Sequence, residues 1–292
     1  MNNRRDLLSL VLLLSIFPAC ATSPRAQAPA PGGGSTPAGR DASEYLQATL
    51  WVQTSAEYRV VLETAYRYAS QALDAALKDT ARSAALEQTG DFSSFPPAVV
   101  VDVDETVLDN SACQARMALT GFAYDPKLWS AWVARAAAPP IPGALDFARH
   151  ASALGIEVFF VTNRAAGEEA ATRNNLLSQG FPVHEKPDSL LLKDERPEWG
   201  SDKSSRRAYV ARSYRILMLV GDDLGDFLSY DKAGPAERVR LAEANRSRWG
   251  SDWFMLPNPQ YGSWERATYG YQPGLTDRQI LEAKKAALRP FY

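Results

Sequence analysis

The sequence predicts an α/β fold: a Rossmann-like parallel sheet with helices on both faces, plus a smaller helical and aromatic cap subdomain. Two observations predict it. Apolar, β-branched runs of strand length alternate along the chain with segments of helical periodicity. Three of these runs end directly in polar or acidic residues, which is typical of parallel strands whose carboxyl ends form a ligand site.

Residues 1–19 are interpreted as an export signal. Arg4 and Arg5 give the chain a positively charged start. The apolar run that follows, from Leu7 to Phe17, is too short to span a bilayer. The pattern therefore predicts secretion rather than a membrane-spanning helix.

Cys20 is the expected lipidation site, because it follows Pro18-Ala19, where a lipoprotein signal peptidase would cut. Residues 20–40 are rich in Pro, Gly, Ala and Ser and are expected to form a flexible tether behind such an anchor. The alternative is ordinary signal cleavage near Ala21, which would remove Cys20.

Residues 41–292 are expected to form one folded domain. It begins with a helical part at about 41–90, in which apolar residues recur every three or four positions from 42 to 86. After the first strand comes an aromatic-rich insertion at about 111–140, which is the expected cap. The remaining elements are, in order, a helix over 142–154, a strand over 156–161, a helix over 167–178 ended by Gly180, a helix near 203–213, a strand over 215–220, a helix over 236–248, a strand over 253–256, and a last helix opened by a capping box at 276–279.

Two aspartates end the first apolar run. Asp102 and Asp104 follow Val99-Val100-Val101, and residues two apart on a strand point to the same face. Two buried carboxylates side by side are costly unless a metal or a proton compensates them. The pair therefore marks a candidate catalytic site, since Glu105-Thr106 follows it at once and matching segments appear later in the chain.

The later segments supply complementary chemistry. Thr162 and Asn163 end the second apolar run, and a third run ends in the acidic segment over 221–226. A basic stretch that begins at Lys203 lies between them. Together these residues offer a nucleophile with an acid or base, phosphate-oxygen donors, a cation and metal ligands.

This order of motifs resembles the haloacid dehalogenase superfamily of aspartate-nucleophile phosphohydrolases. The segments DVDETVLDN, FFVTNR, KSSRR, GDDLGDF and FMLPNPQYGSWE are similar to class C acid phosphatases. The likeness is closest to the bacterial lipoprotein-e type, which are 5′-nucleotidases, and it runs from about residue 50 through the C-terminal helix. One departure is Asp223, where the family usually has asparagine.

The resemblance implies a role for each motif residue. Asp102 would be the nucleophile, and Asp104 would protonate the leaving oxygen and then deprotonate the attacking water. Asp102, Asp222 and the backbone carbonyl of Asp104 would bind Mg²⁺, with Asp223 and Asp226 beside the ligands. The remaining implied contacts are those of Thr162 and Asn163 with the phosphoryl oxygens.

Two lysines are candidates for the cation that the family's motifs include. Lys203 is preferred because it precedes Arg206 in the family's Lys-x-x-Arg spacing, and Lys193, after a run of leucines, is the alternative. A lysine in either position could also be a solvated surface charge.

Substrate binding is expected from aromatic residues over the carboxyl edge of the sheet. Tyr124 in the insertion and Tyr261 near the C-terminus could clamp a planar base, by likeness to the lipoprotein-e nucleotidases. The alternative is that both tyrosines only close the insertion onto the core. Further substrate-binding candidates are Trp132 and Arg164, and weaker ones are Trp129 and Trp264.

Net charge and the absence of certain sequence motifs argue against several other classes of protein. The net charge of −2 gives no electrostatic case for binding a nucleic-acid polymer. Neither His150 nor His184 lies in an Arg-His-Gly context, which argues against a histidine-nucleophile phosphatase. No Gly-x-x-x-x-Gly-Lys motif is present, and once Cys20 is lipidated Cys113 has no cysteine partner within the chain.

The sequence thus predicts an exported, lipid-anchored acid phosphatase that uses Mg²⁺ and acts on small phosphomonoesters, in particular nucleoside 5′-monophosphates. It would be an outer-membrane lipoprotein that faces the periplasm or the cell surface. The alternatives are a phosphomutase and a ligand-binding or storage lipoprotein without turnover. The oligomeric state and the pH optimum stay open.

Overall fold

The computed structural model describes residues 43–121 and 124–291. The export signal, the tether and the lipidation of Cys20 therefore lie outside the described residues. Within those residues, no helix combines the length and the apolar character needed to cross a bilayer.

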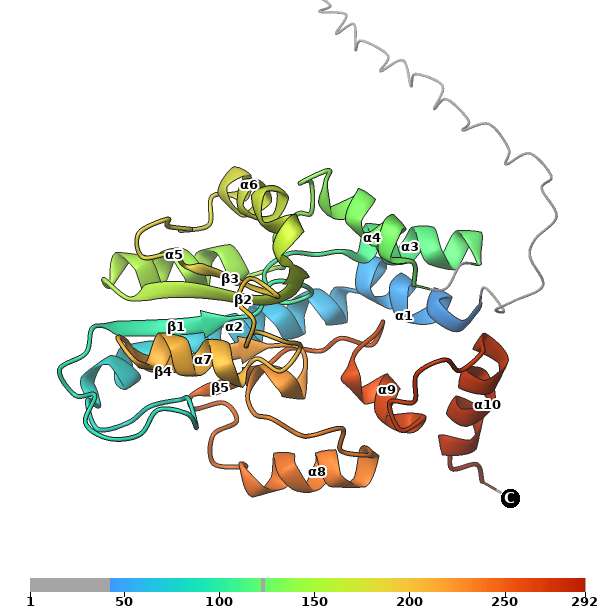
Figure 1. Ribbon diagram of the computed structural model, residues 1–292. Coiled ribbons are helices and arrows are strands. Elements are labelled where there is room, and N and C mark those ends of the chain that lie inside the picture. Colours follow the sequence, from blue (N-terminus) through green and yellow to red (C-terminus); the bar gives the residue numbers. More distant parts are fainter. Residues whose placement is uncertain (1–42, 122–123, 292) are drawn as a thin grey trace, which may run out of the picture. The chain divides into compact units, whose positions relative to one another are not determined.

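The described chain forms one sheet of five parallel strands, in the order β3-β2-β1-β4-β5 (Figure 1). Helices pack on both faces, so the predicted fold class is confirmed. The strands are β1 (Pro97–Val101), β2 (Glu157–Ala165), β3 (Leu190–Lys193), β4 (Arg215–Gly221) and β5 (Trp253–Met255).

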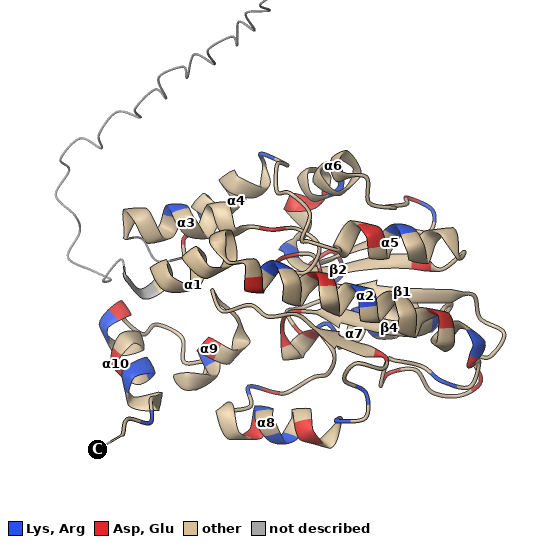
Figure 2. Ribbon diagram, turned by 180° about the vertical axis from the view of Figure 1, so that it is seen from behind, with Lys and Arg blue, Asp and Glu red and all other residues tan. Residues whose placement is uncertain are grey.

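The helices connect and cover these strands. They are α1 (Ser43–Thr54), α2 (Ala56–Lys78), α3 (Ser111–Thr120), α4 (Pro126–Val133), α5 (Ala144–Ala153), α6 (Glu169–Gln179), α7 (Ser204–Ala211), α8 (Pro235–Ala244), α9 (Ser263–Thr268) and α10 (Asp277–Ala287), with short 3-10 turns at η1 (Ala166–Glu168) and η2 (Leu224–Asp226). The insertion after β1 is helical, as expected, and consists of α3 and α4. Basic and acidic side chains are interspersed on α8 and α10 (Figure 2).

Side chains point alternately to the two faces of the sheet along each strand, and this divides the core into two layers. On β1, Val99 and Val101 pack with α2 and α5, and Ala98 and Val100 face the opposite layer, which includes Val210 of α7. Because both faces are covered, every residue of β1 after Pro97 is buried. This central strand is held rigidly, and it carries Asp102 directly after its last residue.

The order of the strands locates the ligand site. From β1 the chain continues to β2 and β3 on one side, and then returns to β4 and β5 on the other. In such sheets the carboxyl ends of the two strands at the reversal form a crevice. Asp102 after β1 and Asp222 after β4 lie at this point. The Asp102 amide donates a hydrogen bond of 3.0 Å to Val220 O.

The helical part expected over about 42–86 consists of two helices and ends earlier, at Lys78. Ser55 separates α1 from α2, because its hydroxyl accepts the Tyr58 amide and caps α2. The helix then ends at Lys78, where the Arg215 guanidinium of β4 binds the last carbonyls of α2, including Leu77 O at 3.0 Å. Two short elements, β3 and α9, were not predicted from the sequence, whereas the helix end at Gly180 and the capping box at Thr276 are confirmed.

Candidate active site

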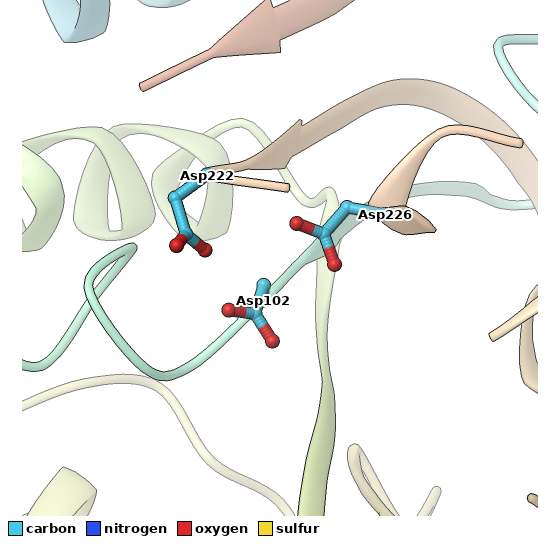
Figure 3. Close-up of side chains that lie close together, drawn as sticks. All are labelled: Asp102, Asp222 and Asp226. Carbon is cyan, nitrogen blue, oxygen red and sulfur yellow. The ribbon is translucent and has the colours of Figure 1, made fainter. Parts of the chain in front are cut away.

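Three carboxylates converge at the carboxyl edge of the sheet. Asp102 follows β1, Asp222 follows β4, and Asp226 ends the turn η2 (Figure 3). One oxygen of each lies within 4.8 Å of the other two. The two loops at the reversal of the sheet thus build one compact acidic cluster.

Lys203 is the cation of this cluster. It is the residue before α7 and is 7% exposed; its ammonium contacts Asp102 Oδ1 and donates to Asp226 Oδ1 at 2.5 Å. Lys193 lies on the edge strand β3, where it pairs with Asp194 at 3.5 Å. Of the two candidate lysines, only Lys203 reaches the acidic cluster.

The crowding of buried charges shifts the pKa values of the residues in this cluster. Burial raises the pKa of Asp102 to about 7, an effect that the Lys203 ammonium opposes and the neighbouring carboxylates reinforce. Burial, followed by the charges of Asp102 and Asp226, also raises the pKa of Asp222 well above its usual range. Burial alone would lower the pKa of Lys203, but the Asp102 and Asp226 carboxylates outweigh it and raise that pKa.

The donor set fits a divalent cation. Three carboxylates against one ammonium leave the cluster short of positive charge, and carboxylate oxygens are the ligands that hard cations prefer. Asn258 donates to Asp222 Oδ2 at 2.8 Å, which fixes that carboxylate as an outer partner of a ligand would. Gly221 leaves room for Asp226, because a Cβ at this position would overlap the Asp226 carboxylate.

Asp226 was expected beside the metal ligands, and its oxygens belong to the cluster itself, although both also accept hydrogen bonds from the protein. Asp223 points elsewhere. Its carboxylate accepts the Gly225 and Ser263 amides at 2.9 and 2.7 Å, so it closes the turn η2 onto the start of α9. The sequence motif could not separate these two aspartates, because it gives the order of the residues and not the direction of their side chains.

Asp104 turns away from the acidic cluster toward β2. Its Oδ1 accepts Arg164 Nη2 at 2.8 Å and Asn110 Nδ2 at 2.9 Å. Thr162 Oγ1 lies 3.5 Å from its other oxygen. The metal contact expected of its backbone carbonyl stays a prediction.

The expected phosphate donors, Thr162 and Asn163, lie near the carboxyl end of β2 and are held by the protein. Thr162 Oγ1 accepts the Arg164 amide at 3.1 Å, and Asn163 Nδ2 donates to Ser201 O at 3.0 Å. Arg206 binds both residues, through Thr162 O and Asn163 Oδ1. These contacts fix the end of β2 in place, and the bonds of Thr162 and Asn163 to phosphoryl oxygens stay a prediction.

Lys203, just before α7, and two arginines of α7 contact the three segments that build the site. Arg206 binds the carboxyl end of β2, and Arg207 donates to the Gly225 and Asp226 carbonyls, each at 3.0 Å. Both arginines are fully buried, and Lys203 stands one turn before them. The sequence carries a signal for this arrangement, because positions 203, 206 and 207 share one face of a helix.

The family comparison agrees with this geometry. Residues 36–264 match the model of the HAD superfamily, subfamily IIIB (Acid phosphatase). The chain belongs to this family.

Solved relatives of the phosphatase family support the same assignment. The class C acid phosphatase from Bacillus anthracis is 31% identical, with a TM-score of 0.77 over 86% of this chain and 99% of that one. A structure of the Bacillus anthracis enzyme with tungstate bound gives 30% identity and a TM-score of 0.75 over the same shares of the two chains. The expected resemblance to class C acid phosphatases is therefore confirmed.

A curated plant relative is more distant. "Acid phosphatase 1" of Solanum lycopersicum is 29% identical over 166 residues, which is 56% of this chain. The match spans 57% of the tomato protein's length.

The candidate substrate residues of this chain lie in different environments. Tyr124, just before α4, is 60% exposed. Tyr261 is half-buried, and its hydroxyl contacts the buried carboxyl of Glu105, which sequence reasoning did not single out. Trp132 and Arg164 are turned inward, with Trp132 Nε1 2.8 Å from Asn110 Oδ1 and the Arg164 side chain 1% exposed. Substrate contact by these four residues stays a prediction.

Proposed function

We propose that this chain is an acid phosphatase that hydrolyses small phosphomonoesters through an aspartyl-phosphate on Asp102. The observation that carries the proposal is the contact between the Lys203 ammonium and the Asp102 carboxylate, within a buried acidic cluster at the reversal of the sheet. Family membership supports it, as does the tungstate bound by the Bacillus anthracis relative, because tungstate is a tetrahedral oxyanion like phosphate.

The residues divide the reaction between them. An Asp102 oxygen attacks the phosphorus, and the ester oxygen leaves with the electron pair of its P–O bond and takes a proton from Asp104. Water then attacks the phosphorus and returns a proton to Asp104 as the bond to Asp102 breaks. Lys203 holds the Asp102 carboxylate and balances negative charge. Mg²⁺, when bound by Asp102, Asp222 and the loop around them, would offset the charge of the phosphoryl oxygens.

We further propose that the preferred substrates are nucleoside 5′-monophosphates. Tyr124 on the insertion and Tyr261 after β5 are aromatic, and both belong to loops that follow the carboxyl ends of β1 and β5. A base stacked on such rings gains roughly 1–3 kcal/mol in single-strand complexes. Simple sugar phosphates would lack this contribution.

The test compares turnover of a panel of phosphomonoesters by residues 41–292, with and without Mg²⁺. We expect chelation to abolish phosphate release and Mg²⁺ to restore it. Asp102→Asn should abolish release, because an amide cannot form the acyl phosphate, and Asp104→Asn should lower it roughly 10²–10⁴-fold. The exposed Asp91→Asn should match the wild type. Near-normal turnover by Asp102→Asn would exclude the aspartate-nucleophile mechanism.

We also propose that Cys20 carries the lipid that holds the enzyme in the cell envelope. Buried acyl chains contribute about 0.8 kcal/mol per methylene, so several chains would retain the protein firmly. The full-length protein should partition into detergent and incorporate labelled fatty acid, whereas Cys20→Ser should not. Equal membrane retention of the wild type and a fully processed Cys20→Ser protein would rule out the anchor.

A further inference from the structure

The carboxylate of Asp104 is held by one of its two oxygens. Oδ1 accepts Arg164 Nε at 3.0 Å, Arg164 Nη2 at 2.8 Å and Asn110 Nδ2 at 2.9 Å. Among the residues that the structure describes, Oδ2 has one hydrogen-bond partner, Thr162 Oγ1 at 3.5 Å. The Asp104 side chain is 18% exposed, whereas Arg164 and Asn110 are buried. The fixed oxygen therefore faces the protein, and Oδ2 is the oxygen available for proton transfer.

Arg164 has little capacity left for a substrate. Besides its two bonds to Asp104, it donates to Thr172 Oγ1 at 3.1 Å and to Asn110 Oδ1 at 3.3 Å. These four bonds occupy most of the five N–H donors of a guanidinium. The geometry gives Arg164 the role of a group that orients Asp104.

The cap helix α4 contacts both residues that hold Asp104. Trp132 Nε1 donates to Asn110 Oδ1 at 2.8 Å. One turn earlier, the Trp129 ring lies against Arg164, with the guanidinium carbon 5.6 Å from the ring centroid. The spacing of three residues places both indoles on one face of α4.

We propose that Trp129 and Trp132 are positioning residues for the acid/base Asp104, acting through Arg164 and Asn110. This inference rests on the proposed phosphatase function. It assigns the inward face of α4 to the protonation of the leaving group rather than to direct contact with the substrate.

The orientation of Asp104 matters because its proton must be transferred toward the ester oxygen. In the first half of the reaction, the Oδ2–H proton passes to the ester oxygen while the P–O bond breaks and its electron pair stays on that oxygen. The bonds at Oδ1 set the plane of the carboxyl group, and so decide whether Oδ2 points at this oxygen. An alkyl alcohol is a poor leaving group and needs the proton, whereas p-nitrophenolate leaves without it.

The test measures kcat/KM for Trp132→Phe on substituted phenyl phosphates of rising leaving-group pKa and on one alkyl phosphate. This ratio reports only steps up to the phosphorylation of Asp102, so it isolates the acid step. Trp132→Phe keeps an aromatic side chain, although a smaller one, and removes the Nε1 donor to Asn110. We expect kcat/KM to fall about three- to tenfold for the alkyl ester, the effect of one hydrogen bond, and to stay unchanged for p-nitrophenyl phosphate. The dependence of kcat/KM on leaving-group pKa should become steeper.

Ser130→Ala on the same helix is the matched control, because the exposed Ser130 donates its hydrogen bond to Glu168 and not to Asn110 or Asp104. It should leave the dependence on the leaving group unchanged. Arg164→Lys keeps the charge and loses the paired geometry, so it should make the dependence of kcat/KM on leaving-group pKa steeper still. If Trp132→Phe does not fold, Arg164→Lys is used in its place.

An equal fall on every ester, or no fall on any, would overturn the positioning role while leaving the phosphatase function intact. Absence of turnover by the wild type on all esters would instead overturn the proposed function, and this inference with it.

Discussion

The acidic cluster and the cap insertion contrast in how they are held. Asp102 and Lys203 are each 7% exposed and lie where two central strands and α7 meet. Tyr124, on the insertion, is 60% exposed. The groups proposed to react are thus fixed by the sheet, whereas Tyr124, one of the two residues proposed to stack on the substrate, belongs to a more accessible element. A family can therefore keep its reaction while its substrate changes.

The largest expected effect comes from removing the central cation. Lys203→Gln leaves Asp102 and Asp226 buried without their common partner, so the free energy of unfolding should fall by about 3–5 kcal/mol and phosphate release should be abolished. Urea unfolding and turnover measure the two effects. Lys193→Gln, which removes a partly exposed charge outside the acidic cluster, should change the unfolding free energy by less than about 0.5 kcal/mol. Equal effects of the two substitutions would contradict the assignment of Lys203.

An intermediate effect is expected in the cap region. Tyr124→Ala should lower kcat/KM for 5′-nucleotides about tenfold, from the loss of stacking, and spare a small aryl phosphate. Tyr261 needs two variants, because its hydroxyl also contacts Glu105. Tyr261→Phe keeps the ring and should retain the preference for nucleotides, and Tyr261→Ala should lose it. If nucleotides and the aryl phosphate fall equally, the tyrosines do not form the proposed clamp.

The smallest effect is expected at the departure from the family motif. Asp223→Asn replaces a carboxylate that faces the Gly225 and Ser263 amides, not the acidic cluster. One of these N–H groups would lose its acceptor, so the unfolding free energy should fall by about 1 kcal/mol. The Mg²⁺ concentration for half-maximal activity should stay unchanged. A shift of tenfold or more would mean that Asp223 contributes to metal binding.

The sequence predicted the parts of the site that lie where apolar runs end. Asp102, Thr162 and Asp222 could be placed at one edge because parallel strands bring their carboxyl ends together. The partners of Asp104 could not be placed. The sequence pattern does not give the direction of the Arg164 side chain, and Asn110, in the same segment as Asp104, turns back to it only after folding.

Some elements of the fold could not be predicted from the sequence, because they are short or depend on distant residues. The edge strand β3 has four residues, and α9 has six, too few to show a period. The end of α2 depends on Arg215, which is distant in sequence.

The contacts of α7 have a consequence for motion. Lys203 contacts Asp102 after β1, Arg206 binds the carboxyl end of β2, and Arg207 binds the turn after β4. Opening any of these segments would therefore break contacts with Lys203 or α7. Local unfolding proceeds in cooperative units. We therefore expect the amides of these segments and of α7 to exchange with solvent as one unit, close to the rate set by global unfolding, whereas those of α4 exchange independently and faster.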